Sequence, residues 1–139
     1  EVKLEKEEEI RQVSSLSNKV TLTNNNMMIH KMKLAISPFE KIASSNKIIE
    51  SRLYDEKRRQ INLGDQIEFS INDNPDRKIT TSVSALYLYP DFESLFSDFP
   101  SSHFGGESKE ELMEEINNFY SKDEQTKFGV IGIKIELVK

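Results

Sequence analysis

Hydrophobic and polar residues alternate along much of the chain after residue 31, and this alternation predicts β-strands. The strands are expected over residues 33–36, 48–53, 66–71, 78–88 and 129–138. Within segment 48–53, Ile49 and Leu53 share one face of the strand. Glu50 and Arg52 share the other face, which puts an opposite-charge pair at the rim of a sheet.

Helical signals interrupt the strands. Residues 37–40 read Ser-Pro-Phe-Glu, so a short helix is expected with Ser37 as its N-cap and a capping box. A second helix is expected over residues 91–99, where large apolar residues recur at helical spacing. A third is expected to begin after Ser108 and to bury a stripe of side chains that includes Phe119.

The predicted element order has no repeating βαβ unit, which argues against a doubly wound sheet. It favours an α+β fold, a small and partly open β-barrel flanked by short helices. Residues 1–26 are polar and charged without a persistent apolar face, so we expect an N-terminal tail or extension there. The folded domain is expected over residues 27–139.

The amino-acid composition excludes several kinds of functional site. The 139 residues include no cysteine and two histidines, so disulfides, thiol catalysis and metal sites are not expected, and no cofactor is indicated. No apolar run approaches the roughly 18 residues of a membrane span, and no secretion signal is apparent. A soluble cytoplasmic protein is the expectation, while the sequence does not indicate an oligomeric state.

Charge is distributed unevenly along the chain, whose net charge is −5. Residues 47–59 carry five basic and three acidic side chains, whereas residues 107–124 carry seven acids and two lysines. A basic patch on an acidic body suits a small anionic ligand or a short nucleic-acid element better than long duplex DNA. Ordinary variation of surface charge is the alternative interpretation.

Lys47, Glu50 and Arg52 are the main candidates for a binding site. Arg52 offers planar donors that suit phosphate, and Lys47 acts as a point charge. Glu50 would accept a hydrogen bond from a base or act as a general base on water. In the structural alternative, the Glu50–Arg52 pair only satisfies two charges and pins two strands.

Further candidates flank this strand. Arg58 and Arg59 belong to a basic triplet that would contact phosphates at the rim of the site, or would be solvated loop charges. Tyr54 and Tyr87 would stack on a base, as in single-strand binders, or would be half-buried barrel residues.

Residues 34–69 resemble the signature of the ASCH domain, a PUA-like β-barrel family, and the resemblance extends over about residues 28–139. The matching positions are Ile42, Lys47, Glu50, Arg52, Gly64, Asp65 and Phe69. The resemblance implies a PUA-like barrel. It also implies one of the family's activities, which include RNA binding, RNA cleavage and amide hydrolysis of N-acetylated cytidine.

The chain departs from the pattern of the hydrolytic members. Ser45 stands where the family has glycine, and Glu50 stands where those members have their threonine nucleophile. Their catalytic lysine matches Lys47, but their glutamate falls near Gly105, with Glu107 as the closest acid.

The leading interpretation is an RNA- or nucleotide-binding domain with a cleft around Lys47, Glu50 and Arg52. One alternative is a hydrolase on the same cleft, with Lys47 and Glu50 as catalytic candidates. Another is an adaptor that docks a protein partner through the acidic helix or the tail.

Overall fold

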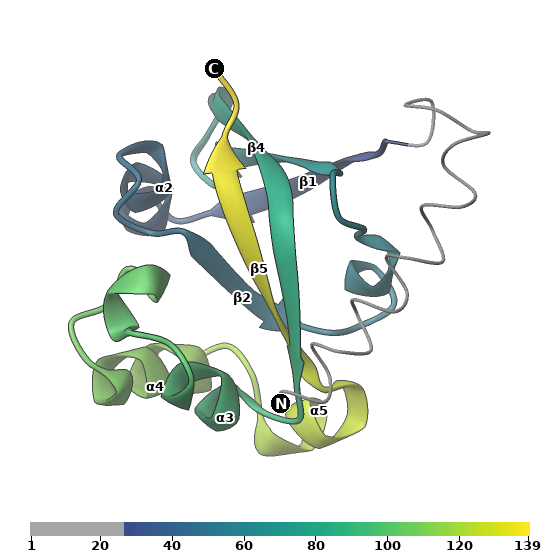
Figure 1. The fold of residues 1–139 in the computed structure, drawn as a ribbon. Coiled ribbons are helices and arrows are strands. Elements are labelled where there is room, and N and C mark those ends of the chain that lie inside the picture. The colour runs from purple at the N-terminus through teal and green to yellow at the C-terminus, as the bar shows by residue number, and fades with distance from the viewer. Residues whose placement is uncertain (1–26) are drawn as a thin grey trace.

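One curled five-stranded sheet, in the order β1-β3-β4-β5-β2, organises the fold (Figure 1). The computed structural model describes residues 27–139, so the tail predicted for residues 1–26 lies outside the described residues. The strands are β1 (Ile29–Leu34), β2 (Ile49–Leu53), β3 (Gln66–Ile71), β4 (Asn74–Tyr89) and β5 (Val130–Leu137). β1 runs parallel to β3 and every other pair is antiparallel. β1 and β2 are therefore the two edges of the sheet.

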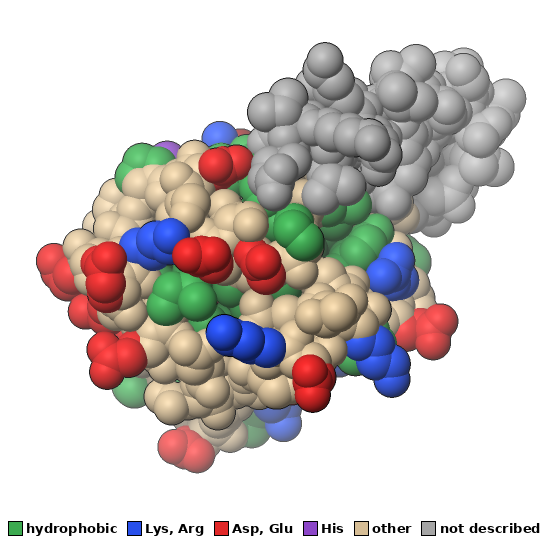
Figure 2. Space-filling model, turned by 90° about the horizontal axis from the view of Figure 1, so that it is seen from below, with side chains coloured by type: hydrophobic (Ala, Val, Ile, Leu, Met, Phe, Trp, Pro, Cys, Tyr) green, Lys and Arg blue, Asp and Glu red, His purple; other side chains and the backbone are tan. Residues whose placement is uncertain are grey.

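Helices close the two ends of the curl. They are α2 (Ile36–Ala43), α3 (Phe92–Ser97), α4 (Lys109–Asn117) and α5 (Lys122–Phe128), with the short 3₁₀ helices η2 (Arg58–Gln60) and η3 (Ser101–Phe104). α2 lies toward one end of the sheet, whereas α3, α4 and α5 gather at the other (Figure 1). Figure 2 looks onto this second, helical end. The predicted α+β fold, a partly open barrel with short flanking helices, is confirmed.

Two apolar clusters fill the interior. The first lies between α2 and the sheet and is centred on Phe39, Ile42, Phe69 and Ile133. The second packs α3 and η3 against β2 and β5, and it includes Phe92, Leu95, Phe104, Ile49 and Val130. β5 contributes side chains to both clusters, whereas the buried apolar side chains of β2, Ile49 and Leu53, belong to the second. The strand that carries Glu50 is therefore anchored by the cluster at the helical end and by its pairing with β5.

The start of α2 differs from the prediction. The helix begins at Ile36 with Ala35 as its N-cap and no capping side chain, so the capping box predicted for residues 37–40 is wrong. Pro38 lies within the first turn, where backbone N–H groups have no intrahelical partner. Proline is therefore tolerated at more than the first helical position, and its place does not fix the helix start.

The strand boundaries also differ. β1 covers residues 29–34 instead of 33–36, and β4 begins at Asn74, directly after a tight turn, instead of at residue 78. A bulge between Val83 and Ala85 in β4 shifts the alternation, so that Leu86 and Tyr89 are buried. Strict alternation would have placed Tyr87 inward.

The region between α4 and β5 was predicted incompletely. α5 was not predicted, although a capping box of Ser121 and Glu124 marks its start. α4 ends at Asn117, and the Phe119 side chain beyond it is 75% exposed, so its predicted burial is wrong. A helical stripe extends only as far as the helix itself.

Candidate functional site

A hydrogen-bonded turn at the end of α2 sets the position of Lys47. The N–H of Ser45 donates to the carbonyl of Ile42 at 3.0 Å, and the N–H of Asn46 donates to the carbonyl of Lys41 at 2.8 Å. Ser45 has φ 65°, so the turn is a Schellman motif with its left-handed residue at Ser45. The N–H of Lys47 also donates to the carbonyl of Lys41, at 3.0 Å, which ties the site to the helix.

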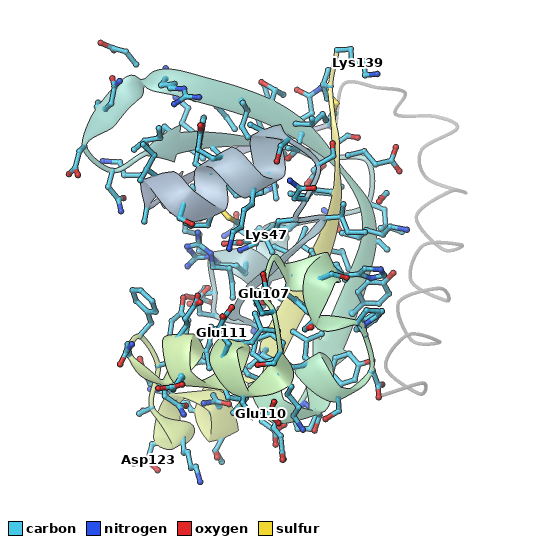
Figure 3. The ribbon with its side chains drawn as sticks, turned by 90° about the vertical axis from the view of Figure 1, so that its left-hand side faces the viewer. Lys47, Glu107, Glu110, Glu111, Asp123 and Lys139 are labelled. Carbon is cyan, nitrogen blue, oxygen red and sulfur yellow. The ribbon has the colours of Figure 1, made fainter. Side chains whose placement is uncertain are left out.

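Lys47 lies between α2 and the segment that leads into α4 (Figure 3). A side chain at Gly105 would approach the Cβ of Lys47 to 3.2 Å, so η3 packs closely over this lysine. The Nζ of Lys41 donates to the carbonyl of Gly105 at 2.7 Å and helps to hold that segment in place.

Lys47 and Arg52 both bind the carboxylate of Glu50. Nζ of Lys47 lies 2.9 Å from Oε1, and Nε of Arg52 donates to Oε2 at 2.6 Å. Glu50 is 3% exposed and pairs with Ile133 across β2 and β5. Each carboxylate oxygen therefore has its own cationic partner inside the protein.

The charges of this triad stabilise one another. Burial by itself raises the pKa of Glu50, but the positive charges and hydrogen bonds of Lys47 and Arg52 outweigh it and lower the pKa to about 2. Burial by itself lowers the pKa of Arg52, and the Glu50 carboxylate reverses that effect and raises it. Glu50 is therefore an anion at neutral pH and a weak proton acceptor.

Arg52 also bridges the opening of the barrel. Its Nη2 donates to the carbonyl of Lys33 at 3.2 Å, which joins edge strand β2 to edge strand β1. The structural role foreseen for the Glu50–Arg52 pair, pinning two strands, is therefore present in the geometry. It leaves the other N–H groups of Arg52 without a hydrogen-bond acceptor among residues 27–139.

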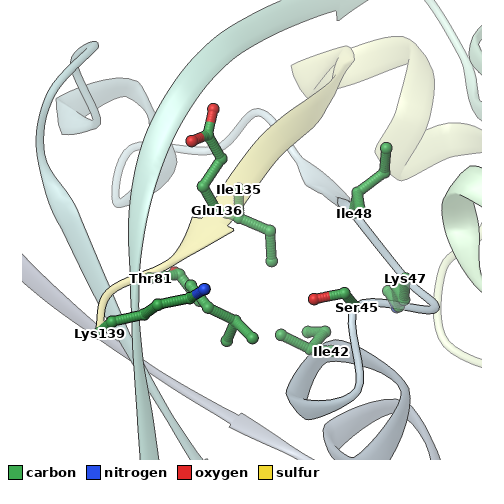
Figure 4. A pocket seen from close by; sticks show the side chains of 9 residues that line it. Ile42, Ser45, Lys47, Ile48, Thr81, Ile135, Glu136 and Lys139 are labelled. Carbon is green, nitrogen blue, oxygen red and sulfur yellow. The ribbon is translucent and has the colours of Figure 1, made fainter.

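Two surface depressions adjoin the triad. The first has a volume of about 220 Å³ and takes Lys47 as one of its walls (Figure 4). Its other walls are mainly apolar with a polar rim, and they comprise Ile42, Ser45, Ile48, Thr81, Ile135, Glu136, Leu137 and Lys139. The second, of about 520 Å³, takes Arg52 as one of its walls and is predominantly basic. Glu50 lines neither depression but binds a residue from each.

The remaining predicted site residues are divided between the second depression and other places. Arg58 lines the second depression with Arg52 and forms an ion pair with Asp55 at 3.1 Å. Arg59 instead covers Tyr54, because its guanidinium carbon lies 4.3 Å from the centre of the tyrosine ring. This face of Tyr54 is thus occupied by an arginine of the same chain.

Tyr87 does not join the triad. Its ring packs against Phe99 with the two centroids 4.6 Å apart, at the edge of the second apolar cluster. Glu107, the acid closest to the family's catalytic position, is exposed, and its N–H donates to Oε1 of Glu111 at 3.1 Å. Within the region from 27 to 139, no ion pair joins Glu107 to Lys47.

Sequence reasoning missed several basic residues that line the second depression, namely Lys31, Lys33 and Lys78. The signal was present, since Lys31 and Lys33 alternate with the buried Met32 and Leu34 along β1. It was overlooked because the first strand was placed at residues 33–36.

No group of three or more His, Cys, Asp or Glu side chains within residues 27–139 is arranged to hold a metal ion. In the same region, no helix has the length and apolarity required to cross a membrane.

Comparison with known structures gives the family of this small α+β domain. The crystal structure of hypothetical protein PH0355 is 33% identical, covers 80% of this chain and 100% of its own, and has a TM-score of 0.71. Protein PF0455 from Pyrococcus furiosus is 32% identical over 81% of this chain and 99% of its own, with a TM-score of 0.63. The chain belongs to the family of these two proteins.

An ASCH protein from Zymomonas mobilis is also among the similar structures, at 14% identity and a TM-score of 0.48, covering 78% of this chain and 66% of its own. Comparisons with protein-family models and with curated proteins give no match.

Proposed function

We propose that this protein binds RNA or a modified nucleoside or nucleotide at the surface around Lys47, Glu50 and Arg52. The observation that carries the proposal is the fixed placement of two cations on one buried carboxylate, each cation belonging to a residue that lines a different depression. Ordered cations with spare donors suit phosphate and base oxygens. The resemblance to ASCH domains, some of which bind RNA, supports the same function.

The two depressions suit different parts of such a ligand. The first, at about 220 Å³, is smaller than the roughly 300–1,000 Å³ typical of pockets for drug-sized ligands. Its apolar walls and polar rim suit one flat, polar-edged group such as a base. The basic second depression suits the phosphate.

The geometry favours binding over turnover. Both oxygens of Glu50 are engaged by cations and its pKa is about 2, so it accepts a proton poorly near neutral pH. Lys47 is held by the same carboxylate. Because Glu50 occupies the nucleophile position of the hydrolytic ASCH members, hydrolysis of N-acetylcytidine or RNA is the secondary candidate.

Binding is tested by titrating the protein with a labelled short mixed-sequence RNA at low salt. We expect Arg52→Ala to weaken binding about tenfold or more, since a hydrogen bond to a charged group contributes roughly 1.5–3 kcal/mol. Lys122→Ala is the matched control, because it removes one positive charge from α5, away from both depressions. Unchanged binding by Arg52→Ala, with its fold verified by circular dichroism, counts against the proposal.

Turnover is tested separately by chromatography after incubation with N-acetylcytidine and with the same RNA. The proposal expects no product from the wild-type protein. Product that appears with the wild type and disappears with Lys47→Ala would instead identify a hydrolase.

A further inference from the structure

The second depression is a basic groove that extends well beyond the triad. We define the basic groove by its six basic residues, Lys31, Lys33, Arg52, Lys57, Arg58 and Lys78. Glu68 is its single acidic residue, so its formal charge is six minus one, or +5. The net charge of the whole chain is −5, so the groove is strongly positive although the protein as a whole is negative.

Strand register arranges part of the groove as a row. Lys33 of β1 lies opposite Ser70 of β3, and Ser70 lies opposite Lys78 of β4. Residues that are directly opposite one another share a face of the sheet. Since neighbouring strands are about 4.8 Å apart, the row from Lys33 to Lys78 spans about 10 Å at the backbone.

Most of the lysines in the basic groove lack an acidic partner. Among residues 27–139, Lys31, Lys33 and Lys57 form no ion pair, and Lys78 lies 3.9 Å from Glu68. A cluster of uncompensated cations repels itself unless an anion is bound, so the arrangement favours a polyanionic ligand.

Arg58 provides an independent sign of a missing acceptor. Its Nη1 donates to Asp55 at 3.1 Å, but its Nε is buried and has no hydrogen-bond partner among the described residues. Buried N–H groups are normally paired, so this unpaired donor shows that the charge and hydrogen-bonding capacity of Arg58 are not fully satisfied by the described residues.

We infer that the basic groove binds the phosphate backbone of single-stranded RNA, several nucleotides of which cross from β4 over β3 and β1 to Arg52. This inference rests on the proposed function, because Arg52 belongs to both sites. A free nucleotide neutralises only part of a row that is about 10 Å long, whereas successive phosphates of one strand neutralise all of it.

Charge elsewhere on the molecule favours a flexible strand over a long duplex. Residues 107–124, at the helical end, carry seven acids and two lysines, and acidic side chains are prominent on that face in Figure 2. A long, rigid duplex that extended beyond the groove would meet this acidic region, while a single strand can bend along the groove.

The test compares two ligands, a single-stranded oligouridylate RNA and uridine monophosphate, over a series of salt concentrations. The test variant is the double substitution Lys33→Ala and Lys78→Ala. Its matched control is Lys122→Ala with Lys127→Ala, which removes the same charge from α5. Lys33 contributes only its backbone carbonyl to the bond with Arg52, so the substitution leaves that bond in place.

We expect the test variant to bind the oligonucleotide about five- to tenfold more weakly at low salt. The slope of log affinity against log salt should fall by about 1 to 1.5, since each phosphate contact on a single strand contributes about 0.7. Binding of the mononucleotide, and binding of the oligonucleotide by the control, should stay within about twofold of wild type.

An unchanged slope in the test variant, or an equal loss in the control, would overturn the inference. Preferential binding of the wild type to anionic phospholipid vesicles over RNA would overturn it too. If Arg52→Ala is impaired while the test variant is not, only the inference about the groove fails. If Arg52→Ala binds both ligands normally, the proposed function fails.

Discussion

Glu50 is a buried side chain that keeps its charge. An isolated carboxylate in such a place would become neutral, because burial penalises the ionised form. Lys47 and Arg52 prevent this by binding one oxygen each. Removing the carboxylate alone would leave two partly buried cations without a partner. This lowers the stability of the fold more than replacing the whole ion-paired group by apolar residues would.

The first prediction concerns the dependence of stability on pH. The pKa of Glu50 is about 2 in the folded protein against an ordinary value of 4.5, so its contribution to stability is complete above pH 4.5. It is lost as the pH falls from 4.5 toward 2. Glu50→Gln should lower the unfolding free energy at pH 7 by about 3 kcal/mol, at about 1.4 kcal/mol per pKa unit.

Denaturant titrations at several pH values measure this effect. In Glu50→Gln, the loss of stability between pH 4.5 and 2 should be smaller than in the wild type, because the mutant lacks the titrating group. Glu115→Gln on the exposed face of α4 is the control and should behave like the wild type. Equal pH profiles for wild type and Glu50→Gln would contradict the account.

Ser45 carries a second prediction at the same scale. It adopts φ 65°, which glycine tolerates better than serine, at the position where the ASCH pattern has glycine. Ser45→Gly should therefore raise the unfolding free energy by up to about 1 kcal/mol, although glycine also gains entropy in the unfolded chain. Thermal unfolding measures the change, with Ser44→Gly, at ordinary negative φ, expected to destabilise.

The pattern of residues in the sequence predicted part of the site. Glu50 and Arg52 are two apart on a strand, so their shared face followed from alternation alone, and Lys47 lay within reach. The coverage of Tyr54 by Arg59 was not predictable, because it depends on how η2 folds back. The bond from Arg52 to Lys33 joins strands that are far apart in sequence, and no local pattern encodes it.

At the scale of elements, α5 fastens the helical end together through Gln125. This buried side chain accepts a hydrogen bond from the N–H of Phe92, at the start of α3, at 3.1 Å. Its amide nitrogen donates to the carbonyl of Ser121 at 3.3 Å. A helix that was missed in the sequence thus satisfies a buried donor of another helix.

The third prediction follows from this contact. Gln125→Leu should lower the unfolding free energy by about 1–3 kcal/mol, because the buried N–H of Phe92 loses its acceptor. Urea unfolding measures the change. Thr126→Leu, an exposed position on the same helix, is the control and should change stability much less. A Gln125→Leu variant as stable as the wild type would show that the contact is not needed.

The positions of strands and helices could be predicted from the sequence where the hydrophobic pattern was long, and less well where it was short. The alternation of β3 and β5 placed both strands within one residue of their observed ends. α5 has few apolar residues between its ends, so periodicity gave no signal and only its capping box marked it. The bulge in β4 changed which residues face inward, and the alternation of hydrophobic and polar residues does not predict a bulge.

At the scale of the whole molecule, opposite charges occupy different regions. The basic groove borders β1, β3 and β4, whereas the acidic residues of α4 and α5 lie at the helical end. The triad ties the edges of the sheet together and contributes Arg52 to the groove. For the ligand that we propose, this polarity would orient the approaching polyanion toward the groove, and added salt should weaken that effect.

The most direct test of the central claim is to map the binding surface by NMR, titrating isotope-labelled protein with short single-stranded RNA. The account predicts that the perturbed backbone amides cluster in β1, in β2 and in the turn before Lys47, and that the changes vanish in Arg52→Ala. Perturbations confined to α4 and α5, or none at millimolar RNA, would contradict a nucleic-acid site at the triad.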